Sequence, residues 1–473
     1  MFVGGAPLAA LPAAIAGCFL QGRTAVKIAY IVDSFPAPSQ TFVVNQILGV
    51  EKCGHDVAIY TTAYPDKDMP PAAEIGGLAR RIHSICPPRN YVTRLFRVLG
   101  LLVACGWRAP RVVVRSLNVF QHGRLAASLW LLHAALTLVR LGERKYDIVH
   151  AQFGPFGLYA LKLLQLGAID GVLVTSFRGY DATKHLRADR RSYTELFRKG
   201  RLFLPVSKSL ARKLVEAGCD PAKIHVLHSG VDCTKLQYAD PRRAEGQPTR
   251  MVTVGRFVEK KGVQYALEAV AQVIASGHAV VYDIVGDGPL RSEIERQIDR
   301  LGIATHVRLP GWKSHHEALA ILQKSHVLLA PSVTAGDGDE EGIPNVVKEA
   351  MAIGLPVVST VHAGIPELVV DGESGFLVPE RSVADLAERI MYLCDHPEIW
   401  PPLSRAARRK VETEFDIGRL SADLVALYAA SINPHGEHTP TVGRATPVAV
   451  GSAITDLEDD SGSHRSRYRT HGN

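Results

Sequence analysis

A strand, a glycine- or proline-containing loop and then a helix recur along the chain, and this repeat limits the fold more than any other feature. It begins at Val26 with V-K-I-A-Y-I-V, turns at 33–36 and continues into an apolar helical stretch over 41–48. Such units build a doubly wound α/β sheet. Strands are predicted at 26–32, 56–60, 148–151, 172–176 and 202–206 in the first half, and at 251–254, 280–285, 307–309, 327–330 and 356–359 in the second. We therefore expect two Rossmann-like domains whose strand carboxyl ends face a ligand cleft.

The domain boundaries follow from the same pattern. The polar segment 238–249 contains no helical pattern and separates the two halves. The 473 residues, 47% of them hydrophobic, can bury sizeable cores, which excludes global disorder. Amphipathic helices predicted at 384–394 and 421–431 are expected to close the second domain. The expected units are a disordered leader (1–25), a first domain (26–240), a second domain (250–415), a closing helix (416–432) and a disordered tail (433–473).

The leader has two interpretations. Residues 2–20 carry no charge, and their number approaches that of a membrane span. No Lys or Arg precedes them, and Pro7 and Pro12 interrupt a helix, so a disordered or mis-started leader and a signal or anchor both stay open. No other run of about 18 apolar residues occurs, which excludes a polytopic membrane protein.

Charge and cysteine content indicate the class of partner. A net charge of +7 suits phosphate-bearing small molecules or an anionic membrane surface and is too small to indicate nucleic acid. Seven scattered cysteines without a C-x-x-C motif favour a reducing compartment and offer no zinc site. Arginines alternate with apolar residues over 89–145. Helices there either lie on an anionic leaflet or pack their apolar side against the sheet.

Loops at the predicted strand ends of the second half carry polar groups. Gly255 lets the chain turn off its strand, and Arg256 and Lys261 in the same loop can converge on phosphate oxygens. The alternative is a solvated basic loop. Gly286 in V-G-D-G-P and Trp312 in P-G-W-K follow the next two strands, where a tight turn and a packing aromatic are the alternatives to a ligand-binding role.

The sharpest signal is E-G-I-P-N-V-V-K-E over 341–349, because a proline stands where a helix would begin and the preceding residues offer free N–H groups. This predicts an anion site at the helix N-terminus. Glu341 in the loop and Glu349 on the second turn can flank one extended ligand and accept hydrogen bonds from its hydroxyls, unless they are merely a loop acid and an exposed helical acid. The backbone of the anion site comes from Gly342, Ile343, Pro344, Asn345 and Val346.

In the first half, Ser39 and Gln40 begin the first predicted helix and can present polar groups to a phosphate, although serine is also a common helix cap. His150 closes a strand and reads equally well as a core or a catalytic residue.

Together these elements resemble the retaining GT-B glycosyltransferases of family four, the glycosyl transferases group 1. The resemblance rests on the spaced glutamates, G-R-F-V-E-K-K-G, V-G-D-G-P and the A-G-I-P-E turn, and it spans about residues 26–430. Phe35-Pro36 and S-Q-T-F over 39–42 look like the subgroup that makes colanic-acid-type exopolysaccharide. The resemblance implies hexosyl transfer from a nucleotide-diphosphate sugar to a saccharide or polyprenyl-diphosphate-linked acceptor. It implies no cofactor and no metal, and a location in the cytoplasm or on the inner face of the membrane.

Residue roles follow from the same resemblance. The second domain would bind the donor and the first the acceptor. Arg256 and Lys261 would hold the diphosphate, Glu349 the ribose hydroxyls and Glu341 the transferred sugar. Gly286 and Trp312 would border the base. Ser39, Gln40, His150, Arg178 and Asp181 would face the acceptor.

One departure from the family pattern puts in doubt the role of a proton-accepting base at that position. Relatives commonly have histidine in an H-G-x-D element, whereas this chain reads R-G-Y-D from Arg178 to Asp181. Arginine stays charged and cannot relay a proton, which leaves an electrostatic role open. A GT-B-type sugar-nucleotide epimerase and a non-catalytic adaptor are the alternative functions. A dehydrogenase is disfavoured because neither half carries a full dinucleotide fingerprint.

Overall fold

The computed structural model describes residues 25–35, 41–63 and 76–433, and the predicted leader and tail lie almost entirely outside these ranges. The first half contains a parallel six-stranded sheet in the order β3-β2-β1-β4-β5-β6. Alternate residues of β1 enter different hydrophobic clusters, Ile28 and Tyr30 on one face and Ala29 and Ile31 on the other. Both faces of the sheet are therefore buried. The strands are β1 (Lys27–Val32), β2 (Asp56–Thr61), β3 (Ile82–Ser84), β4 (Lys145–Gln152), β5 (Asp170–Phe177) and β6 (Leu202–Pro205).

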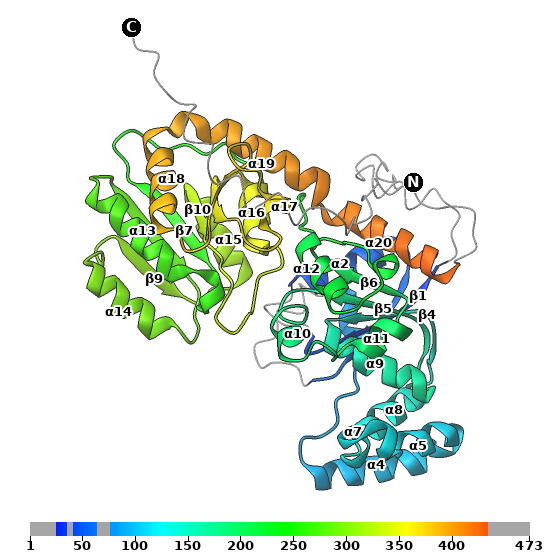
Figure 1. Ribbon diagram of the computed structural model, residues 1–473. Helices are drawn as coiled ribbons and strands as arrows, with labels where there is room; N and C mark the ends of the chain where they lie inside the picture. The colour runs from blue at the N-terminus through cyan, green and yellow to red at the C-terminus, as the bar shows by residue number, and fades with distance from the viewer. Residues whose placement is uncertain (1–24, 36–40, 64–75, 434–473) are drawn as a thin grey trace, which may run out of the picture. The chain divides into compact units, whose positions relative to one another are not determined.

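Helices connect these strands and cover the sheet (Figure 1). Between β3 and β4 the connection expands into a group of helices, of which α4, α5, α7 and α8 are seen together in Figure 1. The helices of the first half are α2 (Thr41–Lys52), η2 (Gly76–Arg81), α4 (Tyr91–Cys105), η3 (Gly106–Arg108), α5 (Pro110–Ser116), α6 (Val119–His122), α7 (Arg124–Ala127), α8 (Trp130–Leu141), α9 (Gly154–Leu166), α10 (Lys184–Ala188), α11 (Thr194–Lys199), α12 (Lys208–Glu216) and η4 (Pro221–Lys223).

The second half repeats this architecture with the strand order β12-β11-β10-β7-β8-β9, again parallel. Alternate residues of β10 also divide between two clusters, so this sheet too is buried on both faces. Its strands are β7 (Thr249–Val254), β8 (Val280–Val285), β9 (Val307–Gly311), β10 (Val327–Ala330), β11 (Val357–Thr360) and β12 (Phe376–Val378). Its helices are η5 (Glu259–Lys261), α13 (Val263–Ala275), α14 (Arg291–Leu301), α15 (His315–Gln323), α16 (Asn345–Ile353), α17 (Ile365–Leu368), α18 (Val383–Asp395), η6 (Pro397–Ile399) and α19 (Trp400–Glu414).

The predicted strands are confirmed with small shifts at their ends. The two strands that the sequence pattern missed, β3 and β12, lie at sheet edges and have three residues each. Three residues are too few to display a hydrophobic period.

The last helix, α20 (Ile417–Ile432), corrects the expectation that it closes the second domain. Leu424 and Tyr428 belong to the same cluster as Tyr30 of β1, and the hydroxyls of Tyr428 and Tyr30 are 2.9 Å apart. α20 therefore covers the first sheet, whereas α18 covers the second. An amphipathic pattern shows that a helix has an apolar face, but not which sheet that face meets.

We expect Leu424→Ala to weaken the first half selectively, because this fully buried side chain fills the cluster beneath α20. The expected loss of unfolding free energy is about 3 kcal/mol. Hydrogen exchange followed by mass spectrometry should show faster exchange in β1 and α2, with α18 unchanged. Leu427→Ala, the same change at a half-buried position of α20, is the matched control and should cost less. Faster exchange confined to the second half would contradict this packing.

Candidate functional site

The loops that follow β7 and β8 pack directly on one another. A Cβ at Gly286, where φ is +145°, would lie 1.9 Å from the carbonyl oxygen of Gly255, so only glycine fits there. The Phe257 N–H donates to the Asp287 carbonyl oxygen at 2.8 Å, and the Phe257 ring is buried. This packing fixes the loop from which the side chain of Arg256 emerges into solvent.

Lys261 and Glu341, predicted separately from the sequence, form an ion pair. The Lys261 Nζ lies 3.1 Å from Glu341 Oε1, and the Lys260 Nζ lies 3.7 Å from the same oxygen. Burial opposes ionisation of Glu341, but the two lysines outweigh it and lower the pKa of the carboxyl. The site therefore holds an ionised carboxylate between cations.

A histidine that the sequence analysis gave no role positions Glu341. The Glu341 N–H donates to His362 Nε2 at 3.2 Å, and His362 Nδ1 lies 2.6 Å from Glu380 Oε1. An accepting Nε2 requires the proton on Nδ1, which donates to Glu380. His362 stands beside the A-G-I-P-E turn, and only its position after a strand could have indicated the role.

The helix predicted from E-G-I-P-N is α16, and Pro344 occupies its N-cap. Among the described residues, no protein atom accepts a hydrogen bond from the N–H groups of Asn345 and Val346. Ile343, just before the cap, is buried. A Cβ at Gly342 would lie 2.5 Å from the Arg178 carbonyl oxygen, so glycine permits this close approach. The helix N-terminus thus offers two backbone donors beside the Glu341 ion pair.

Glu349 lies on the second turn of α16, as predicted, and its Oε1 is 2.9 Å from His315 Nε2 on α15. The sequence analysis did not identify His315. Trp312, between β9 and α15, has 61% of its side chain exposed. Its predicted place beside a base stays a prediction.

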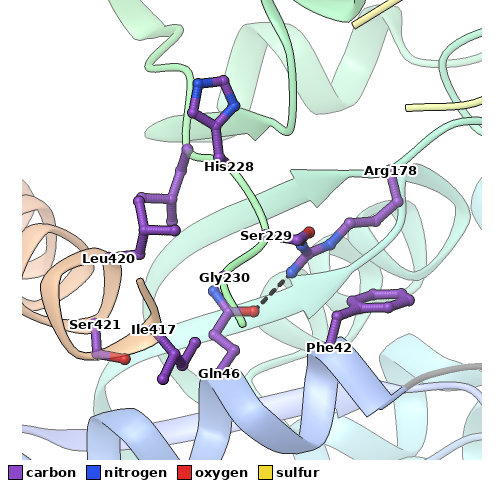
Figure 2. Close-up of a pocket in the computed structure, with 10 residues that line it drawn as sticks. Phe42, Gln46, Arg178, His228, Ser229, Gly230, Ile417, Leu420 and Ser421 are labelled. Atoms are coloured by element: carbon purple, nitrogen blue, oxygen red, sulfur yellow. Dashed lines mark hydrogen bonds between the residues drawn. The ribbon is translucent and has the colours of Figure 1, made fainter. Parts of the chain in front are cut away.

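Arg178 is the residue at which the sequence departs from the family pattern, and three side chains accept hydrogen bonds from its guanidinium. It donates to Gln46 Oε1 at 2.7 Å, to Gln152 Oε1 at 2.8 Å and to Ser229 Oγ at 2.7 Å. Its guanidinium lies over the ring of Phe42, and Figure 2 shows Arg178, Phe42, Gln46 and Ser229 around a small pocket. Burial lowers the pKa of Arg178 to about 10, so the group stays charged at neutral pH.

Two predicted acceptor-side residues are internal. His150 is fully buried between the Tyr428 hydroxyl at 2.6 Å and Ser176 Oγ at 2.8 Å, and burial holds its pKa well below the ordinary value. Asp181 is also fully buried and accepts from the N–H groups of Gly154, Arg178 and Gly179 at 2.9–3.0 Å.

Neither His150 nor Asp181 is therefore accessible to an acceptor, and both brace the backbone or core around Arg178. His150 lies near the end of a strand and Asp181 follows one, as a site residue often does, which is why the pattern suggested them. Ser39 and Gln40 lie outside the described residues.

Lys348, next to Glu349 on α16, is a charged residue that the sequence analysis did not single out. Its side chain is fully buried, and Nζ donates to the Ser229 carbonyl oxygen at 2.6 Å. Burial lowers its pKa to about 7. Ser229 therefore receives hydrogen bonds from Arg178 of the first half and Lys348 of the second.

Comparisons with known proteins identify this arrangement. Residues 39–235 match the family model described as glycosyltransferase family 4, and residues 237–410 match that of glycosyl transferases group 1. The chain belongs to glycosyltransferase family 4. It is 37% identical over 413 residues to the putative colanic acid biosynthesis glycosyltransferase WcaL of Salmonella typhimurium, covering 85% of this chain and 99% of that protein. It is 34% identical to the amylovoran biosynthesis glycosyltransferase AmsK of Erwinia amylovora, covering 83% and 96%.

A solved structure of Anabaena HepE in complex with UDP and glucose superposes with a TM-score of 0.62 at 18% identity, covering 86% of this chain and 100% of that one. This likeness shows the fold alone, which is GT-B. This glycosyltransferase contains, within residues 25–35, 41–63 and 76–433, no group of three His, Cys, Asp or Glu side chains placed to hold a metal ion. No helix of the same ranges is long and apolar enough to span a bilayer.

We expect Lys348→Met to change how stability depends on pH. The folded lysine loses its proton near pH 7, whereas the unfolded lysine keeps it to about pH 10.5. Between these values the unfolded chain binds more protons, so the lysine makes the wild-type unfolding free energy rise with pH by up to about 1.4 kcal/mol per pH unit.

Urea unfolding of Lys348→Met at pH 7 to 10 should therefore lack this contribution, so that the variant's stability relative to wild type falls as the pH rises. The stability of Lys324→Met, a change at an exposed lysine, should depend on pH as that of wild type does. Parallel curves for wild type and Lys348→Met would contradict the assignment.

Proposed function

We propose that this glycosyltransferase moves a hexosyl unit, with retention of configuration, from a nucleotide-diphosphate sugar to a lipid-linked saccharide acceptor. The product would serve a cell-surface polysaccharide of the kind for which the colanic acid and amylovoran relatives are named. The observation that carries the proposal is the Lys261–Glu341 pair beside the open N-terminus of α16.

These groups suit the departure of a nucleotide diphosphate. Cleavage of the anomeric C–O bond leaves negative charge on the phosphates, which Arg256, Lys261 and the N–H groups of Asn345 and Val346 can stabilise. Each such donor, fixed before the reaction, lowers the barrier by about 3 kcal/mol, by analogy with oxyanion-hole deletions. The charge is thus met by the protein itself, and the proposal needs no metal and no cofactor.

Positive charge develops on the sugar ring at the same time. Glu341 is ionised, lies against two lysines and is positioned by His362, so it can balance that charge. Arg178 cannot take the acceptor proton, because it stays charged and its guanidinium already donates to Gln46, Gln152 and Ser229. We infer that the leaving phosphate accepts the proton, which is compatible with retention.

The acceptor determines where the enzyme works. A saccharide carried on a polyprenyl diphosphate stays at a membrane surface, whereas nucleotide sugars are dissolved in the cytoplasm. We therefore propose that the enzyme works peripherally on the cytoplasmic face of the cell membrane.

We expect Lys261→Met and Glu341→Gln each to lower transfer by 100-fold or more, because each removes a charge matched to the transition state. A panel of radiolabelled nucleotide sugars offered with native lipid extract would measure transfer to lipid. Lys324→Met is the matched control for loss of an exposed lysine and should retain wild-type transfer. Unchanged transfer in both site variants would overturn the site, and release of an epimerised free sugar without an acceptor would identify an epimerase instead.

We further expect the product to keep the anomeric configuration of the donor. The active donor from the panel, supplied with known configuration, gives a glycoside whose anomeric proton coupling is read by NMR. An inverted product would contradict the role given to the leaving phosphate.

A further inference from the structure

Helix α4 has two apolar stripes on opposite faces. Its inner face buries Arg94, Val98, Leu101 and Cys105, which recur at intervals of three and four residues. A second stripe recurs at the same intervals, two positions out of step with the inner residues and thus about 200° around the helix from them. It consists of Val92, Phe96, Leu99 and Val103. The side chains of this outer stripe are exposed, to 68% at Phe96 and 83% at Val103.

Exposed apolar side chains continue beyond α4. Trp107 in η3 is 71% exposed, Val114 in α5 is 72% exposed, and Phe120 in α6 is fully exposed. A set of this size is unusual on a protein that meets only water, since exposed apolar residues normally occur singly. We call the outer stripe with Trp107, Val114 and Phe120 the apolar face. Among the described residues, the side chains of this face are left to solvent.

The charges around the apolar face have a single sign. Residues 76–142 contain no Asp, Glu or Lys. Their basic residues are Arg80, Arg81, Arg89, Arg94, Arg97, Arg108, Arg111, Arg115, Arg124 and Arg140. Arg94 is buried and donates to the carbonyl oxygens of Pro88, Arg89 and Ser128, so it holds the inner side of α4. Arg97, Arg108, Arg111 and Arg115 are exposed on the same elements as the apolar face.

We propose that the apolar face docks on an anionic phospholipid bilayer, with Phe96, Val103 and Trp107 entering the acyl boundary and the arginines meeting lipid phosphates. This deepens the proposed location at a membrane by naming the surface and the lipid. Arginine stems can lie along apolar surface while their guanidinium groups reach the headgroups. An amphipathic helix with aromatic and aliphatic residues on one face and arginines beside them lies in the interface plane in this way.

Charge decides between a bilayer and a second copy of the chain. Two copies joined through this face would oppose arginine with arginine, and residues 76–142 supply no carboxylate to separate them. An anionic leaflet supplies the opposite charge, and each basic residue near its surface raises the binding affinity about fivefold. The chemistry of the face therefore favours phosphate headgroups over another copy of the chain.

The test is sedimentation of the purified full chain with vesicles of phosphatidylglycerol and phosphatidylethanolamine. We expect binding that weakens at least tenfold in Phe96→Glu/Val103→Glu and about as much in Arg97→Gln/Arg111→Gln. Binding should also fall when phosphatidylcholine replaces phosphatidylglycerol and when salt is raised. Val370→Glu, the same change at an exposed valine of the second half, should bind like wild type.

Circular dichroism and the thermal midpoint of each variant would show that it is folded. Because the changed side chains are exposed, both readouts should match those of wild type. Vesicle binding by the full chain that is absent, or equal in wild type and Phe96→Glu/Val103→Glu, would overturn the proposal. A dimer in analytical ultracentrifugation that the same variant dissociates would overturn it in favour of a second copy. Binding needs no catalysis, so its failure is distinct from a failure of glycosyl transfer.

Discussion

Burial of each parallel sheet on both faces is the constraint on which the rest of the structure depends. Strands such as β1 and β10 place alternate residues in different hydrophobic clusters, so a polar side chain on either face of these strands would not reach solvent. Much of the polar chemistry of the second half is thereby placed in the loops at strand ends. Arg256, Glu341 and Trp312 come from separate loops of the second half that follow β7, β10 and β9 in this way.

The same constraint explains what the sequence could predict. Buried strands give continuous β-branched runs, and the glycines and prolines after them mark the loops, so ten of the twelve described strands and, separately, Lys261 and Glu341 as site candidates followed from the pattern. The ion pair between these two side chains was not predicted. The roles of His315 and His362 were not predicted, because their partners are distant in the sequence and no local pattern connects them. These partners are Glu349 and Glu341. The sheet that α20 covers was missed for the same reason, since a helix pattern carries no information about its tertiary partner.

Burial also misleads when it involves polar residues. His150 and Asp181 follow or close strands and were assigned to the acceptor, yet both are fully enclosed. Asp181 gathers the N–H groups of Gly154, Arg178 and Gly179, which a loop turning sharply off a strand would otherwise leave unpaired. A polar residue at a strand end can thus either support the loop or contact a ligand. Only the three-dimensional contacts distinguish these two roles.

Arg178 shows how the two roles combine. Its backbone is held by Asp181, its guanidinium is held by Gln46, Gln152 and Ser229, and its carbonyl oxygen lies where any side chain at 342 would collide. A histidine offers two ring nitrogens and could not donate to three such acceptors at once. Arg178 therefore provides a fixed charge in place of a possible proton relay, and it holds Ser229 of the same half, whose carbonyl oxygen also accepts from Lys348 of α16 in the second half. In the proposed mechanism the acceptor proton passes to the donor phosphate instead, because the guanidinium of Arg178 cannot accept it.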